Sequence, residues 1–254
     1  MASASDTTQE DIVTAALLVI GDEILSGRTK DKNIGYIADH CTRIGIQLME
    51  VRVVPDIEAE IIDAINTLRA KFTYLFTTGG IGPTHDDITA DCVAKAFGVT
   101  LGVDQRALDL MLPVYKARGV EVTPARLRMA RVPKEAEIVF NSVSTAPGFM
   151  LGNVVVMAGI PSVMQVMLDD ASTRLLKTGR KMLSTTLDLY RPEGEIASLF
   201  EAHQNEHPDV PMGSYPFNRD NRFGTQLVLR STDEGKLAAA DAGLREKLAA
   251  KGWL

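Results

Sequence analysis

Short apolar runs alternate with stretches of helical periodicity along the first hundred residues, and few folds accommodate this pattern. Residues 14–20 form a continuous apolar run that ends at a glycine, which is typical of a strand buried on both faces. Apolar side chains then recur at helical spacing over residues 34–44, with Asp31 or Asn33 available as the N-cap and Gly45 as the terminator. The chain is therefore expected to begin with a strand followed by a helix.

The alternation continues to about residue 177. Residues 46–54 are predicted to form a second strand, residues 57–68 a helix that Asp56 can cap, and residues 72–77 a third strand. Further helices are predicted at 89–97, 104–117, 123–131 and 160–176, and further strands at 137–140, 148–151 and 154–158. Because alternating strands and helices imply a parallel sheet covered on both faces, we predict an α/β domain over residues 12–177.

The order of elements changes after residue 180. Strands are predicted at 183–190, 211–216 and 225–231, and helices at 193–203 and 234–250, which suits a small antiparallel α+β domain over residues 181–254. The spacing of His203 and His207 places two imidazoles on one helical face. However, Gln204 stands where a zinc-protease motif needs Glu, and Pro208 ends the helix, so the sequence disfavours a metal site there.

The charge of the chain, the length of its apolar runs and the positions of its cysteines exclude several functional classes. The net charge is −6, and no cluster of Lys and Arg indicates a nucleic-acid surface. The apolar runs at 15–20 and 154–158 are far shorter than a membrane span, and residues 1–11 are polar and lack the features of a secretory signal, so we expect a cytoplasmic protein. Cys41 and Cys92 each lie in an apolar periodic stretch and are expected to be buried, reduced thiols.

The segment most informative about chemistry is Thr-Thr-Gly-Gly-Ile-Gly-Pro-Thr-His-Asp-Asp-Ile-Thr at 77–89, which we call the glycine loop. It follows the third strand and leads into a helix, where open α/β sheets place ligands. Gly79, Gly80 and Gly82 allow backbone N–H groups to approach an anion closely, and the helix N-terminus adds partial positive charge. Since the loop matches neither a P-loop nor a dinucleotide fingerprint, it predicts a phosphate or pyrophosphate cradle, with a tight turn as the alternative.

Four carboxylates are expected near this loop. Asp86 and Asp87 lie within it, and helix capping explains one of them but not both. Glu23 and Asp56 follow the first and second strands, so a parallel sheet would bring them to the same edge. Because carboxylates repel phosphate, the sequence predicts either a bridging divalent metal, with Asp86, Asp87 and Glu23 as its candidate ligands, or a carboxyl group that takes up a proton.

Five motifs, in order along residues 14–177, resemble the MoaB/Mog molybdopterin-binding domain. They are Gly-Asp-Glu-Ile-Leu-Ser-Gly at 21–27, Val-Pro-Asp at 54–56, the glycine loop, Thr-Ala-Pro-Gly-Phe at 145–149 and Gly-Ile-Pro at 159–161. The motifs are most similar to the version in competence/damage-inducible protein A (CinA) and at the N-terminus of eukaryotic FAD synthase. Residues after 180 resemble the small domain that follows in CinA proteins. The resemblance implies a three-layer αβα sandwich around a mostly parallel sheet.

The resemblance also implies site residues and an activity. Asp56 and Asp87 match acidic positions that molybdopterin adenylyltransferases use in catalysis. Ligand or phosphate contact is implied for Gly21, Glu23, Gly79, Gly80, Gly82, Thr84, Thr145, Gly148, Gly159 and Pro161. His85-Asp86 replaces a Pro-Arg-like pair of those enzymes, which favours a metal-dependent site. The CinA and FAD-synthase versions imply a pyrophosphatase for ADP-ribose or FAD-like dinucleotides that uses Mg²⁺, Mn²⁺ or Co²⁺.

Two other functions stay open at this point. One is a pterin- or nucleotide-binding module without turnover, with molybdopterin as a candidate ligand, and the other is a molybdopterin adenylyltransferase of molybdenum cofactor biosynthesis. Similar family members associate through the αβα domain, so the resemblance implies a homo-oligomer, with a homodimer favoured over a trimer. The length leaves no room for the amidase domain of CinA or the nucleotide-transfer domain of FAD synthase, so we expect an isolated module.

Overall fold

The computed structural model describes residues 12–254, which divide into one compact unit that ends at Gly179 and a second that spans Arg180–Leu254. Residues 1–11, where the sequence predicts no secretory signal, lie outside the described residues. Each unit is described by itself.

The first unit contains eight strands and seven helices among its described residues. The strands are β1 (Val13–Ile20), β2 (Ile46–Val54), β3 (Tyr74–Thr78), β4 (Leu101–Val103), β5 (Arg131–Pro133), β6 (Glu137–Val139), β7 (Gly148–Leu151) and β8 (Val154–Met157). The helices are α1 (Asp22–Leu25), α2 (Asn33–Ile44), α3 (Glu58–Lys71), α4 (Thr89–Phe97), α5 (Gln105–Ala117), α6 (Pro124–Arg128) and α7 (Pro161–Arg174).

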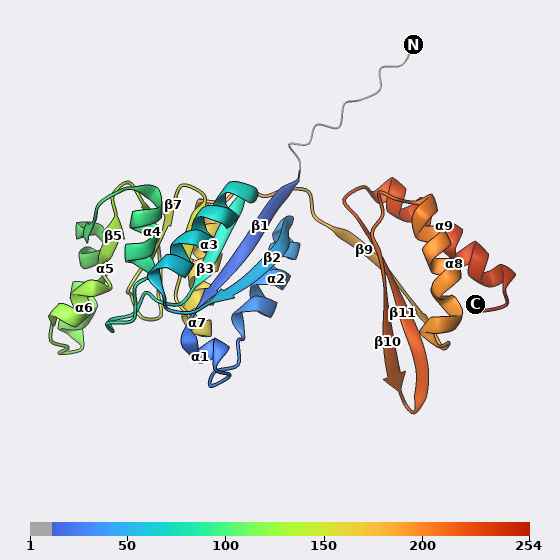
Figure 1. The fold of residues 1–254 in the computed structure, drawn as a ribbon, viewed down its shortest axis with the longest axis horizontal. Coiled ribbons are helices and arrows are strands. Elements are labelled where there is room, and N and C mark those ends of the chain that lie inside the picture. Colours follow the sequence, from blue (N-terminus) through green and yellow to red (C-terminus); the bar gives the residue numbers. More distant parts are fainter. Residues whose placement is uncertain (1–11) are drawn as a thin grey trace, which may run out of the picture. The chain divides into compact units, whose positions relative to one another are not determined.

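The central sheet has the strand order β2-β1-β3-β8-β7-β6 (Figure 1). The pairs from β2 to β8 are parallel, whereas β7 pairs antiparallel with both of its neighbours. Ile20 pairs with Val54, and Val19 pairs with Thr78, so β1, β2 and β3 end at the same edge of the sheet. The predicted mostly parallel sheet is confirmed, and the segments after these three strands emerge together.

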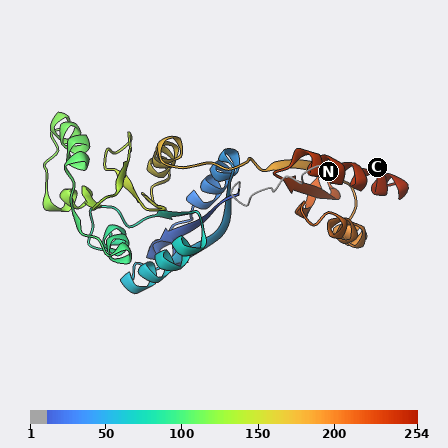
Figure 2. The ribbon, with the colours of Figure 1, turned by 90° about the horizontal axis from the view of Figure 1, so that it is seen from above.

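Helices cover both faces of this sheet. Leu17 and Leu18 are adjacent in β1 and point to opposite faces, since side chains alternate along a strand. One buried cluster joins Leu17 to residues of α2 and α7, and the other joins Leu18 to residues of α3, α4 and α5. Figure 2 shows α2 (blue) and α7 (gold) on one side of the sheet and α3 (cyan) and α4 (green) on the other. The unit is therefore an αβα sandwich.

Two helix starts next to the sheet edge differ from the predicted caps. The N-cap residue of α2 is Lys32, which makes no side-chain cap hydrogen bond, and not Asp31 or Asn33 as predicted. The Asp31 carboxylate, one residue earlier, accepts from the backbone N–H groups of Asn33, at 3.0 Å, and of Ile34, at 2.8 Å. Helix α3 also begins without a side-chain cap, so the prediction that Asp56 caps it is wrong. Asp56 Oδ2 instead accepts from the backbone N–H of Asp22 at 2.9 Å, which joins the ends of β1 and β2.

The second unit has a three-stranded antiparallel sheet of order β10-β11-β9 with two helices packed against it (Figure 1). Its elements are β9 (Leu183–Leu189), α8 (Glu193–Glu206), β10 (Met212–Arg219), β11 (Arg222–Ser231) and α9 (Glu234–Ala250). Leu227, Ile196 and Leu244 share its buried core. This confirms the predicted small α+β domain, although α8 is three residues longer than predicted. Within residues 12–254, every helix is too short or too polar to cross a lipid bilayer.

Candidate functional site

A pocket of about 550 Å³ lies at the sheet edge where β1, β3 and β8 end. The predicted site residues that line it are Glu23, Gly79, Gly80, Gly82, Asp87, Gly159 and Pro161. Apolar side chains that include Ile81, Met129 and Met167 form another part of the wall. The pocket thus combines exposed backbone of the glycine loop, two carboxylates and an apolar surface.

The floor of the pocket requires glycine where three segments converge. Gly79 has φ of 101°, a conformation that other residues rarely adopt, and an added Cβ would collide with the carbonyl oxygen of Ile20. Gly79 N–H donates to the Met157 carbonyl at 3.2 Å. A Cβ on Gly159 would lie 3.3 Å from the Gly79 Cα. These close approaches fix the start of the glycine loop between the ends of β1 and β8.

Thr89, the first residue of α4, fastens the glycine loop to that helix. Its hydroxyl donates to the Gly79 carbonyl at 3.0 Å, and its backbone N–H donates to the Gly80 carbonyl at 3.0 Å. Thr89 is fully buried. Both hydrogen bonds are therefore shielded from water, and they hold the loop in one conformation.

The Asp87 carboxylate is held in place by its own loop. Asp87 Oδ2 accepts from the Thr84 backbone N–H at 2.8 Å and from the Thr84 hydroxyl at 2.5 Å. A side chain at Gly82 would place its Cβ 2.6 Å from Asp87 Oδ2, so only glycine leaves room for the carboxylate. Arg128 Nη2 donates to the Asp87 carbonyl at 3.1 Å. Thr84 thus positions the Asp87 carboxylate, and Asp87 lines the pocket.

Carboxylates gather beside the pocket. Asp56 does not line the pocket. Burial raises the pKa of Asp56, and the charges of Asp22, Glu23 and Asp86 raise this pKa further. The hydrogen bond from the Asp22 N–H group acts in the opposite direction and lowers it. Asp86 is exposed, and the neighbouring Thr84 side chain lowers its pKa. Because these negative charges repel one another, bringing a cation to this edge is favourable.

The charges on the wall itself are negative. Glu23 and Asp87 line the pocket, and no Lys or Arg of the described residues does. Lys30 and Lys32 line an adjoining hollow of about 60 Å³. Arg131 lies on the other side of the loop and is paired with the Asp91 carboxylate through two hydrogen bonds of 2.8 and 2.9 Å. A phosphate in the pocket would therefore meet carboxylates without a side-chain cation on the wall.

Several predicted residues lie outside the pocket wall. Gly21 is buried at the end of β1, against the Glu23 carboxylate. Thr145 has a left-handed backbone with φ of 68°, and its hydroxyl donates to the Ser144 carbonyl at 2.6 Å, whereas its neighbours Ser144 and Ala146 line the pocket. Gly148 is buried in β7, where a Cβ would collide with a backbone oxygen of β8, so packing accounts for this glycine.

The predicted metal ligands Glu23, Asp86 and Asp87 lie on the same edge but are not drawn tightly together. Within residues 12–254, they do not form a group whose ligand atoms all lie within 4.8 Å of one another. Glu23 and Asp86 are both exposed, so their side chains have space to reorient.

Cys41 and Cys92 are buried and free, as predicted, and burial raises the pKa of each thiol to about 12, which excludes them as nucleophiles.

The sequence did not reveal the role of Asn33. Its Nδ2 donates to the Gly159 carbonyl at 2.8 Å and so ties α2 to the pocket floor. Asn33 Oδ1 and Thr78 Oγ1 are buried without a hydrogen-bond partner in the described part of the chain, and both residues line the adjoining hollow. The only signal in the sequence was that Asn33 could cap a helix, which is a different role.

Comparison with known proteins places both units. The family of probable molybdopterin binding domains matches residues 16–178, and the middle domain of FAD synthase matches residues 181–254. A protein of Pyrobaculum calidifontis is 32% identical over 211 residues, which cover 80% of this chain and 80% of that protein. A probable FAD synthase of Caenorhabditis elegans is 30% identical over 261 aligned residues, which cover 93% of this chain and 50% of that protein.

A solved structure supports the same assignment. The crystal structure of the protein CinA from Thermoplasma acidophilum is 32% identical and has a TM-score of 0.59, covering 65% of this chain and 99% of its own. The chain spans only half the length of the FAD synthase that it matches. Because the domain match covers more than half of the chain, the chain belongs to the family of probable molybdopterin-binding domains, in the CinA-like form whose second domain matches the middle domain of FAD synthase.

Proposed function

We propose that this protein hydrolyses the pyrophosphate bond of a nucleotide such as ADP-ribose or an FAD-like dinucleotide, with the help of a divalent cation. One observation carries the proposal. The same pocket is lined by the bare backbone of the glycine loop, which suits phosphate, and by the carboxylates of Glu23 and Asp87, which repel it. A cation that binds both the carboxylates and the phosphates would remove this repulsion, so that phosphate could bind beside the glycine loop.

The ligands available fit a hard cation. Glu23, Asp86 and Asp87 supply carboxylate oxygens, the ligands preferred by Mg²⁺ and Mn²⁺. Asp87 is already oriented by Thr84, and the two exposed carboxylates can complete the set together with phosphate oxygens. A bound divalent cation would neutralise charge that develops on the phosphates and make a coordinated water more acidic.

The size and lining of the pocket suit a dinucleotide. A volume of about 550 Å³ lies within the range of small-molecule sites. Met129, Ile160 and Met167 form an apolar surface against which a purine or flavin ring can pack, while the glycine loop faces the phosphates. We place the base on the apolar wall and the pyrophosphate beside Gly80 and Gly82.

Asp87 and Asp56 have different roles in the proposed hydrolysis. Asp87, on the wall, orients a water molecule toward one phosphorus atom. Asp56, at the same sheet edge and with a pKa that burial raises, takes up the proton that the water releases. A new bond forms between the water oxygen and phosphorus, the bond from phosphorus to the bridging oxygen breaks, and the bridging oxygen leaves with the second phosphate.

The experiment is to incubate the full chain with ADP-ribose, FAD or ATP, with and without Mg²⁺, Mn²⁺ or Co²⁺, and to separate the products by chromatography. ADP-ribose should give AMP and ribose phosphate, and FAD should give AMP and FMN, only when a cation is present. Asp87→Asn keeps the shape of the side chain but removes its charge, so we expect kcat to fall by roughly a hundredfold or more. Asp63→Asn, at an exposed position of α3, is the matched control and should leave activity unchanged.

Two results would contradict the proposal. Full metal-dependent activity in Asp87→Asn would mean that this carboxylate only shapes the loop. Tight binding of one of these nucleotides by the wild type, without product formation, would instead favour a binding module. Thermal melting of Asp87→Asn alongside the wild type separates a local defect from loss of the fold.

A further inference from the structure

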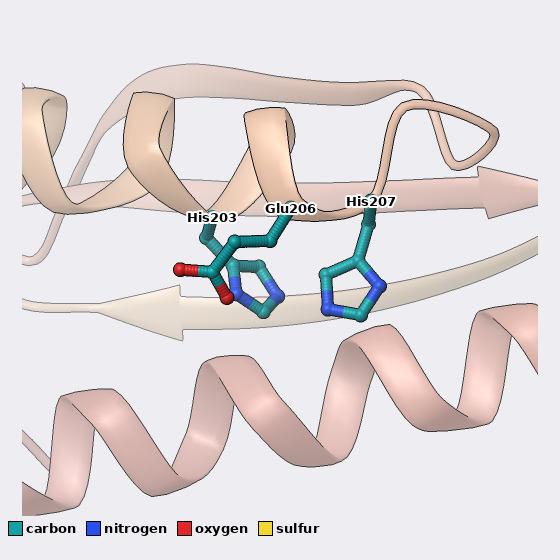
Figure 3. A group of neighbouring side chains, drawn as sticks. All are labelled: His203, Glu206 and His207. Atoms are coloured by element: carbon teal, nitrogen blue, oxygen red, sulfur yellow. The ribbon is translucent and has the colours of Figure 1, made fainter.

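The C-terminal end of α8, in the second unit, brings together two imidazoles and a carboxylate: His203 and Glu206 lie in the last turn, and His207 is the C-cap residue (Figure 3). His203, Glu206 and His207 each offer one ligand atom, and these atoms all lie within 4.8 Å of one another. The two imidazole ring centroids are 4.6 Å apart. Within residues 12–254, this is the only group of three or more His, Cys, Asp or Glu side chains with such spacing.

The buried histidine of this group has one free nitrogen. His203 is fully buried, and its Nε2 lies 2.8 Å from the Ala240 carbonyl oxygen of α9. Because a carbonyl oxygen only accepts, Nε2 carries the hydrogen, and Nδ1 is left as the remaining ligand atom. Nδ1 has no hydrogen-bond partner in the part of the chain that the structure describes, which is unusual for a buried polar atom.

This pattern is the one that metal-binding histidines show. A histidine that binds a metal through one ring nitrogen commonly donates its other N–H to a backbone carbonyl, which fixes the tautomer and the orientation of the ring. The Ala240 carbonyl fills that role for His203.

The opposite helix leaves space beside the rings. Gly243 of α9 faces them, since a Cβ there would lie 3.3 Å from His203 Cε1 and 3.9 Å from His207 Nε2. Figure 3 shows the three side chains between α8 and α9. A Cβ at position 243 would press on the His203 ring and only touch the His207 ring, so the glycine leaves room for the His203 ring.

The other two side chains can complete a coordination shell. Glu206 is exposed and His207 is half-buried, so their side chains can rotate. Ligand atoms that already lie within 4.8 Å of one another can thus reach the separation of about 3.4 Å that tetrahedral zinc requires. Glu206 Oε2 presently accepts from Lys247 Nζ at 2.5 Å. The Lys247 ammonium group holds the Glu206 carboxylate beside the imidazole rings. A bound metal cation would replace Lys247 as the partner of this carboxylate.

We propose that His203, Glu206 and His207 form a binding site for a first-row transition-metal cation of the Zn²⁺ class, with water as a further ligand. Two imidazole nitrogens favour such cations over Mg²⁺ and Ca²⁺, which prefer oxygen ligands. Gln204 rules out one zinc-protease motif, but that motif concerns catalysis and not the binding of a metal. The site is independent of the nucleotide pocket of the first unit.

The test is a calorimetric titration of the full chain with ZnCl₂ in the presence of excess Mg²⁺, which occupies oxygen sites. We expect one Zn²⁺ to bind per chain, and Co²⁺ to give a visible absorption band of low-symmetry coordination. His207→Gln and Glu206→Gln, both away from the buried core, should each weaken binding at least tenfold, the scale on which even outer-shell changes act. Glu201→Gln, exposed on the same helix, and Asp87→Asn in the first unit are the controls and should bind as the wild type does.

A further variant separates metal binding from structural disruption. Lys247→Met removes the cation that competes for Glu206, so it should strengthen Zn²⁺ binding, whereas a merely structural role of the Lys247–Glu206 pair predicts no gain. Absence of binding up to about 1 mM Zn²⁺ would overturn the proposal. Equal affinity in the wild type, His207→Gln and Glu206→Gln would overturn it as well.

Discussion

Replacing Thr89 by Val should loosen the glycine loop while almost preserving the volume of the side chain. The substitution deletes the hydroxyl that donates to the Gly79 carbonyl at 3.0 Å, and both residues are buried. A buried acceptor that loses its donor destabilises a fold by about 1–3 kcal/mol. For a unit of this size, a central value of about 2 kcal/mol corresponds to a decrease in Tm of roughly 4–8 °C.

The assay compares Thr89→Val with Thr89→Ser by calorimetric melting and by nucleotide hydrolysis. Ser retains the hydroxyl and loses one methyl group, whose burial contributes about 0.8 kcal/mol. We therefore expect Thr89→Ser to melt closer to the wild type and to retain turnover. Thr89→Val should lose turnover even at temperatures where it is fully folded, because the loop that holds the phosphates is no longer fixed to α4.

Two results would refute this reasoning. A Tm for Thr89→Val within about one degree of the wild type would show that the buried hydrogen bond contributes little to stability. A larger decrease for Thr89→Ser than for Thr89→Val would show that packing of the methyl group, and not the hydroxyl, holds the loop.

Three further predictions address the carboxylates and the assembly. Gly82→Ala places a Cβ 2.6 Å from Asp87 Oδ2, so it should shift the carboxylate and lower metal-dependent activity at least tenfold, measured by steady-state kinetics, while the fold melts near the wild-type Tm. The raised pKa of Asp56 means that ionising it destabilises the folded state, so Asp56→Asn should raise Tm at pH 7. This gain should shrink as the pH falls through the raised pKa of Asp56 and vanish below the ordinary pKa of an aspartate. We also propose a homodimer, and light scattering at micromolar concentration that gives the mass of one chain would contradict it.

Several elements that the sequence predicted well have long, regular patterns, although the four-residue strand β7 was also predicted to the residue. The predicted bounds of β2, α4 and α9 agree with the structure to the residue, because apolar periodicity defines each of them over many positions. The two-stranded ladder of β4 and β5 was not predicted, since three residues per strand are too few to show a period. Helix α1, of only four residues, was missed for the same reason.

The site was predictable where it follows from strand direction and not where it depends on distant contacts. Glu23 and Asp87 come from segments after β1 and β3, and parallel strands bring such segments to one edge. The hydrogen bond from Asn33 to Gly159 joins residues 126 positions apart, and no local pattern encodes it. The wrong prediction that Asp56 caps α3 has a similar cause. Asp56 instead accepts a hydrogen bond from the backbone N–H of Asp22, which follows the neighbouring strand β1.

The strand order has a consequence for biosynthesis. β3 is buried along its whole length, yet one of its two pairing edges belongs to β8, which begins about 75 residues later in the chain. At a synthesis rate of roughly 5–20 residues per second, this edge of β3 stays unpaired for about 4–15 s until β8 has been synthesised. A strand that is buried in the finished domain and still has an open edge is a template for pairing with another chain, so the nascent protein passes through a period of exposure to aggregation. β3 also leads directly into the glycine loop, so the strand that positions the ligand pocket is exposed to wrong pairing while the chain is being made.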